Sequence, residues 1–134
     1  MAVARAEKLP IQTSGDIVRV RQAVRSWAVE LGFNLVDQTK IVTAASELAR
    51  NAFVHGGGGT VELESLVEAA RRGLRLSFAD QGPGIVDVAQ ALKDGFTTGA
   101  GLGLGLGGAK RLSNEFEIRS QPGAGTVVRI TRWK

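Results

Sequence analysis

The chain contains no cysteine and has a single histidine, His55. The lack of cysteine excludes disulfide bonds and metal sites built from thiolates. No apolar run reaches the roughly 20 residues that a membrane-spanning helix needs, and residues 1–8 lack the apolar core of a signal peptide. These absences predict a cytoplasmic protein that has no membrane partner.

Aromatic residues and long runs of one charge are also scarce. The chain has five Phe, two Trp and no Tyr, and no basic run or basic and aromatic patch marks a nucleic-acid surface. Seventeen Lys and Arg against thirteen Asp and Glu give a net charge of +4, which fits a solvated surface, an anionic ligand or an acidic partner. We therefore expect no nucleic-acid partner.

Glycine, by contrast, is abundant, and three clusters of it mark the second half of the chain. They lie at residues 80–84, 101–108 and 123–125. Glycine lets backbone amides approach a ligand closely, and a glycine run that opens a helix offers unpaired N–H groups to an anion. Together with the polar residues Glu47 and Asn51 upstream, these clusters predict a nucleotide site.

The hydrophobic pattern predicts one domain, residues 1–134, with a partly flexible N-terminus at residues 1–10. After a short strand at Ile11, the expected order is helix, helix, strand, strand, helix, strand, strand. Thr13 or Ser14 caps the first helix, and Asp37 caps the second, which runs to about Val54. Strands are expected at residues 60–68, 74–78, 116–118 and 128–130, a short helix can form over 87–93, and a helix runs from about 104–107 to 112. Short connections between paired strands favour antiparallel neighbours.

Asp80 follows the predicted strand 74–78 and keeps the parity of its apolar residues, so its carboxylate should point to the covered side of the sheet. Thr126 shares the parity of the next apolar strand and should face the same side. A buried carboxylate needs hydrogen-bond donors. An adenine amine would be one such donor, and a local backbone amide is the alternative.

Glu47 and Asn51 lie one turn apart on the polar side of the second helix. The simplest interpretation is a pair of exposed polar residues on an amphipathic helix. The functional interpretation is more specific, because an amide oxygen is a hard, neutral ligand that suits Mg²⁺. A carboxylate beside it can orient or deprotonate an attacking hydroxyl.

The glycine run at residues 101–108 matches neither common phosphate motif. It does not follow a strand within a strand–helix–strand unit, and no Gly-Lys-Ser or Gly-Lys-Thr follows it. Each glycine inside a helix costs about 1 kcal/mol relative to Ala, and phosphate binding would offset that cost, whereas a flexible loop is the alternative. Lys110 can neutralise phosphate or face solvent at a helix C-terminus, where cations are favoured.

These four motifs resemble those of the GHKL, or Bergerat-fold, ATPases. The pair Glu47 and Asn51 resembles the N box of that family, and Asp80, Gly82 and Gly84 resemble its first glycine box. The second box is matched by Gly101, Gly103 and Gly105, and the third by Gly125 and Thr126. Within the family, residues 46–51, 80–85, 94–98 and 101–112 are most similar to the switch serine/threonine kinases of bacterial stressosome modules and to anti-sigma-factor kinases. The resemblance extends from about Ile11 to Trp133.

The resemblance implies a two-layer α/β sandwich, with a mixed, mostly antiparallel sheet and helices on one face. It implies an ATP site with Mg²⁺ on Asn51, Glu47 at the attacking group, and Asp80 accepting from the adenine amine. Gly84 and Thr126 would support the base pocket, and Gly82 would belong to the same nucleotide site. Gly101, Gly103 and Gly105 would line the phosphates, and Lys110 would also belong to the nucleotide site.

The resemblance also implies partners. The substrate would be a Ser or Thr of a STAS-domain protein, and the released kinase would activate a metal-dependent protein phosphatase. One alternative is an anti-sigma-type binding module in which ATP orders the binding surface, and a weaker one is the catalytic half of a histidine kinase. The chain departs from related kinases at residues 97–100, where an Arg before the second glycine box is absent. The substrate or Lys110 would then supply the cation for the γ-phosphate.

Overall fold

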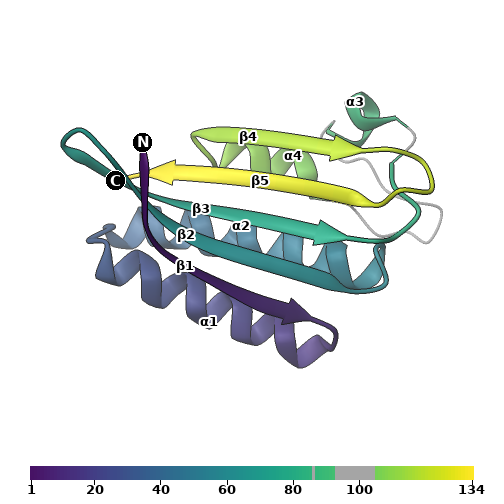
Figure 1. The fold of residues 1–134 in the computed structure, drawn as a ribbon, viewed down its shortest axis with the longest axis horizontal. Coiled ribbons are helices and arrows are strands. Elements are labelled where there is room, and N and C mark those ends of the chain that lie inside the picture. Colours follow the sequence, from purple (N-terminus) through teal and green to yellow (C-terminus); the bar gives the residue numbers. More distant parts are fainter. Residues whose placement is uncertain (86, 93–104) are drawn as a thin grey trace.

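The computed structural model describes residues 1–85, 87–92 and 105–134 (Figure 1). Its elements in chain order are β1 (Ala2–Ile11), α1 (Ser14–Glu30), α2 (Leu35–Val54), β2 (Gly59–Glu68), β3 (Arg71–Asp80), α3 (Val88–Ala91), α4 (Leu106–Arg111), β4 (Glu115–Ser120) and β5 (Thr126–Trp133). The strands form one sheet in the order β1-β2-β3-β5-β4, and each described pair is antiparallel. Helices α1, α2 and α4 cover one face, which confirms the expected two-layer arrangement.

The N-terminal residues form a longer strand than the short one expected at Ile11. They form the edge strand β1, which pairs with β2 from Ala2↔Val67 to Ile11↔Gly59. Most side chains of β1 are exposed, so main-chain hydrogen bonds rather than apolar burial hold it, and such a strand leaves little hydrophobic pattern in the sequence. Arg5 adds a side-chain anchor, because its guanidinium lies 4.1 Å from the ring centroid of Trp27 on α1.

The starts of the two long helices show one correct and one wrong prediction. Thr13 caps α1 as expected, and Asp16 completes a capping box with it. The prediction of Asp37 as the cap of α2 was wrong, because Asn34 takes that place and its Oδ1 accepts the N–H of Asp37 at 2.8 Å. The additional helical residues after this cap, Leu35 and Val36, are exposed, so they did not extend the apolar stripe that marked the helix.

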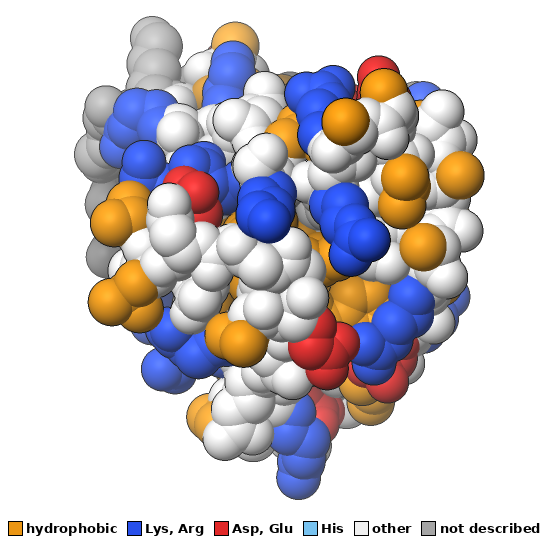
Figure 2. Space-filling view, turned by 90° about the vertical axis from the view of Figure 1, so that its left-hand side faces the viewer, with side chains coloured by type: hydrophobic (Ala, Val, Ile, Leu, Met, Phe, Trp, Pro, Cys, Tyr) orange, Lys and Arg blue, Asp and Glu red, His pale blue; other side chains and the backbone are white. Residues whose placement is uncertain are grey.

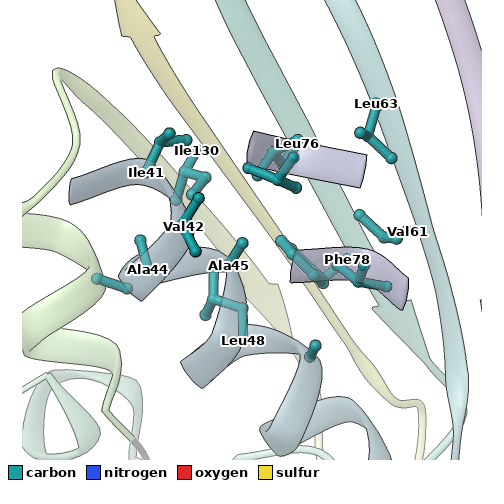
Figure 3. Close-up of a cluster of buried hydrophobic side chains, with 14 of the residues drawn as sticks. Ile41, Val42, Ala44, Ala45, Leu48, Val61, Leu63, Leu76, Phe78 and Ile130 are labelled. Carbon is teal, nitrogen blue, oxygen red and sulfur yellow. The ribbon is translucent and has the colours of Figure 1, made fainter. Parts of the chain in front are cut away.

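The core lies between α2 and the covered face of the sheet (Figure 3). Ile41, Ala45 and Leu48 of α2 point toward the apolar side chains of the strands, which include Val61, Leu63, Leu76, Phe78 and Ile130. Fully burying one such aliphatic side chain stabilises the fold by about 1.5–3 kcal/mol. This packing fixes the position of α2 along the sheet, so that Asn51 and the helix end lie near the end of β3.

The two chain ends lie together at the opposite end of the sheet from the tip of β3 (Figure 1). Figure 2 views this terminal end, where Lys and Arg side chains are spread among apolar ones. Arg71, Arg72 and Lys134 are exposed there. None of the described helices has the combination of length and apolar character that a membrane-spanning helix requires.

Candidate functional site

All four sequence motifs meet, at least in part, at one end of the sheet. Asp80 is the last residue of β3, and the register sets it opposite Thr126 of β5 on one side and Gly59 of β2 on the other. The prediction that Asp80 and Thr126 face the same side is therefore confirmed. Because α2 ends at Val54, just before β2 begins, its C-terminal turn reaches the same place.

Asp80 is half-buried and keeps an available oxygen. Its Oδ1 accepts the N–H of Gly82 at 2.9 Å, so the local backbone amide expected as one alternative satisfies one carboxylate oxygen. Among the described residues, Oδ2 has no hydrogen-bond partner. A half-buried carboxylate with one oxygen satisfied and one available can accept a hydrogen bond from an amine such as that of adenine.

Gly82 and Gly56 give the site a wall without side chains beside Asp80. A Cβ added to Gly82 would lie 2.6 Å from the Cα of Gly56 and 3.1 Å from Oδ1 of Asp80. The two backbones therefore approach more closely than any other residue type would permit. A flat ligand can lie against such a surface, so these residues fit a nucleobase.

The loop after β3 is held by the turn between β4 and β5. The N–H of Gly123 donates to the carbonyl of Pro83 at 2.6 Å, and the N–H of Ile85 donates to Oγ of Ser120 at 2.7 Å. Gly84 has a φ of +77° and its Cα faces the carbonyl of Gln121, which explains why glycine is needed there.

Ser120 is a site residue that the sequence reasoning missed. Its hydroxyl lies 2.8 Å from Oγ1 of Thr126, and either atom can be the donor. The signal was present, because Ser120 continues the parity of Phe116 and Ile118 in β4 and lies opposite Thr126 in the register. The pair places hydroxyl groups one strand away from Asp80.

Glu47 and Asn51 lie on α2, and both are half-buried rather than exposed. The Glu47 carboxylate packs against Gly105, the N-cap of α4, where an added Cβ would lie 3.1 Å from Cβ of Glu47 and closer still to Oε2. Gly105 has a φ of +66°, which favours glycine at this helix start. The structure therefore brings the predicted N-box carboxylate to the last glycine of the predicted second box.

The donor set near Asn51 suits an ion that keeps water and phosphate ligands. Its Oδ1 is buried. No group of three or more His, Asp or Glu that could hold a metal occurs among the described residues. Mg²⁺ commonly takes only one or two protein ligands and completes its shell with waters and substrate phosphates, so an amide oxygen at this place fits Mg²⁺.

Of the remaining candidate residues, two lie outside the part of the chain that the structure describes and two lie within it. Gly101 and Gly103 lie outside the described residues. Lys110 is exposed on the last turn of α4, more than one turn from Gly105. His55 is the C-cap of α2, which agrees with its interpretation as a helix end.

Known protein families and relatives match nearly the whole chain. Residues 12–132 match the model of the family described as the histidine kinase-like ATPase domain. The serine/threonine-protein kinase RsbT of Bacillus subtilis (strain 168) is 46% identical over 123 residues, which cover 92% of each chain. The anti-sigma F factor of Thermoanaerobacter sp. (strain X514) is 29% identical over 119 residues, 84% of this chain and 82% of that one.

A solved structure has a similar fold over nearly the whole chain. The crystal structure of the RsbU and RsbW domains of Rv1364c from Mycobacterium tuberculosis superposes with a TM-score of 0.65 at 25% identity. The match covers 96% of this chain but 32% of that longer chain.

Proposed function

The chain belongs to the histidine kinase-like ATPase family, and we propose that this ATP-dependent serine/threonine protein kinase acts as a bacterial partner switch. In this proposal it phosphorylates a Ser or Thr of a STAS-domain scaffold or antagonist protein in the cytoplasm. Once released from that protein, it binds and activates a metal-dependent protein phosphatase. The observation that carries the proposal is the 46% identity to a serine/threonine kinase over nearly the whole chain.

Asp80 is proposed to recognise the adenine base. Its Oδ2 would accept a hydrogen bond from the exocyclic amine, while the Gly82 N–H holds Oδ1 in place at 2.9 Å. Gly56 and Gly82 would leave room for the ring beside the carboxylate, and Thr126 would line the same side of the sheet. A charged acceptor rejects bases that present an oxygen where adenine presents an amine.

Asn51 and Glu47 are proposed to act at the phosphate end. Asn51 would hold Mg²⁺, which would supply positive charge to offset that of the ATP phosphates. Glu47 would orient the substrate hydroxyl and accept its proton as the oxygen attacks the γ-phosphorus, while the bond from that phosphorus to the β,γ-bridging oxygen breaks and ADP leaves. The packing of Glu47 against Gly105 supports this role, because it holds the carboxylate at the start of the predicted phosphate-binding segment.

The γ-phosphate is proposed to receive its cation from Lys110 or from the substrate. Phosphoryl transfer depends strongly on such a charge. Residues 97–100, where related kinases carry an Arg, contain no charged residue here. If the substrate supplies the cation, phosphoryl transfer becomes dependent on a bound partner, which suits a switch.

A binding module is the second candidate, favoured by the 29% identity to an anti-sigma F factor. The two candidates are separated by incubating the protein with γ-labelled ATP and candidate STAS-domain proteins, followed by identification of the modified amino acid. Phosphoserine or phosphothreonine on a STAS protein supports the kinase. Tight binding of a STAS protein without label in it would replace the kinase proposal with the binding module.

A further inference from the structure

We propose that Gly56, two residues beyond the end of α2, is a positioning residue for nucleotide selection. Because Gly56 has no side chain, the Asp80 carboxylate can occupy the position from which it accepts a hydrogen bond from the base. The N–H of Gly56 donates a hydrogen bond to the backbone carbonyl of Asn51, the proposed metal ligand. This inference rests on the proposed function, in which Asp80 accepts from the adenine amine.

The space around Gly56, rather than its backbone conformation, requires glycine. An added Cβ would lie 2.5 Å from Cβ of Asp80, closer still to its Cγ, and 2.7 Å from the carbonyl oxygen of Ala52. The φ of Gly56 does not lie in the left-handed range, so a larger residue could adopt its backbone. Gly57 is the opposite case, because it has a φ of +73° and nothing within 4 Å of an added Cβ.

The structure indicates which side of this contact would move. The Ala52 carbonyl belongs to α2 and accepts the N–H of Gly58 at 2.8 Å, and Ala52 is buried in the core. Among the described residues, the Gly82 N–H alone holds the Asp80 side chain, at 2.9 Å, in the loop where β3 ends. A methyl group at residue 56 would therefore displace Asp80 and its bond to Gly82, while α2 stays packed.

Gly56 also links the two ends of the nucleotide site. Its N–H donates to the carbonyl of Asn51 at 3.0 Å, and the N–H of His55 donates to the same oxygen at 3.0 Å. Asn51 and Asp80 are thus connected through a single residue, although they lie on α2 and β3. The separation between the metal ligand and the base acceptor is set by this short connection.

The test measures dissociation constants for ATP and for inosine triphosphate, which has a carbonyl oxygen in place of the amine. The wild-type protein should prefer ATP, and Gly56→Ala should lose roughly tenfold or more of that preference, the range expected for a hydrogen bond to a charged group. The ratio of the two constants is insensitive to partial unfolding, since both report the same folded molecules. The matched control is Gly57→Asn, which tolerates the left-handed conformation and should keep the wild-type ratio.

Asp80→Asn separates failure of this inference from failure of the proposed function. If Asp80→Asn keeps the preference for ATP, the base-recognition role of Asp80 is wrong and the inference is overturned with it. If Asp80→Asn loses the preference for ATP and folded Gly56→Ala keeps it, only the positioning role of Gly56 is overturned. Should Gly56→Ala not fold, Gly82→Ala replaces it, because its Cβ would press on the Gly56 Cα; an unchanged ratio in that variant overturns the inference.

Discussion

Asn51 and Glu47 share one side of α2, one helical turn apart, with Glu47 against Gly105. We expect Asn51→Ala to abolish the gain in ATP affinity that Mg²⁺ gives the wild-type protein, because no cluster of acidic or histidine ligands in the described parts of the chain could replace it. Ala is a good helix former, so α2 should remain intact. Calorimetric titrations with ATP, with and without Mg²⁺, measure this gain.

The exposed residue Thr43, two turns earlier on α2, is the control for this prediction. Thr43→Ala should bind ATP and respond to Mg²⁺ as the wild-type protein does. Asn51 is not the metal ligand if Asn51→Ala shows the same response.

Single residues differ in how far the sequence could predict them. The common side of Asp80 and Thr126 followed from strand alternation alone, and the register confirms it. Gly56 could not be found in this way, because its neighbour Asp80 belongs to another strand and only the packed structure brings them together. Its sequence context, four successive glycines, indicated only the end of a helix.

At the scale of elements, Asp16 fixes the start of α1 and makes it sensitive to acid. The N–H of Gln12 donates to its carboxylate at 2.8 Å and lowers the pKa of Asp16 below its ordinary value, and the Thr13 N–H and Arg19 act in the same direction. A lowered pKa in the folded state adds stability above the ordinary aspartate value of about 3.9, and this contribution is lost as the pH falls through the folded pKa.

Asp16→Asn should therefore reduce stability at pH 7 and flatten the acid side of the stability profile. Urea midpoints measured from pH 7 down to pH 2.5, for the wild-type protein and the variant, give both profiles. The prediction fails if the variant loses as much stability as the wild-type protein between pH 5 and pH 2.5.

Asp37 connects the start of α2 to β5 and, through Arg132, to the end of α4. Arg132 donates from Nη2 to Asp37 at 2.7 Å and from Nη1 to the Leu112 carbonyl at 2.8 Å. Asp37→Ala leaves a largely buried guanidinium without its counter-ion, so we expect a loss of about 2–4 kcal/mol in the free energy of unfolding. Equilibrium urea unfolding measures this loss.

The exposed pair Glu68 and Arg71, at 3.7 Å, provides the comparison. Glu68→Ala should cost less than about 1 kcal/mol, as exposed ion pairs do. Equal losses in the two variants would show that the ion pair of Asp37 and Arg132 stabilises the fold no more than an exposed ion pair does.

The sequence predicted elements with a buried stripe better than elements without one. The extent of α2 to Val54 and the order of the strands followed from apolar periodicity. Strand β1 and the first residues of α2 expose most of their side chains, so periodicity could not mark them. There, main-chain pairing and the choice between two possible caps, Asn34 and Asp37, decide the structure.

At the scale of the whole molecule, the site is assembled from segments far apart in the chain. The end of α2, the end of β3, the start of α4 and the start of β5 meet at one end of the sheet, and the chain termini lie at the other (Figure 1). Motif order alone predicted which segments contribute. Their distances depend on how α2 packs on the sheet through residues such as Leu48 and Phe78 (Figure 3), which no local pattern specifies.

The central claim is that this assembled site transfers phosphate rather than only holding ATP. The most direct test is a single-turnover time course of phosphoryl transfer to a STAS-domain protein, run for the wild-type protein and for Glu47→Gln beside an ATP titration of each. Glutamine keeps the shape that packs against Gly105 but cannot accept a proton as a carboxylate does. We predict unchanged ATP affinity and a transfer rate roughly 10²-fold slower or more. A wild-type rate in Glu47→Gln would contradict the account.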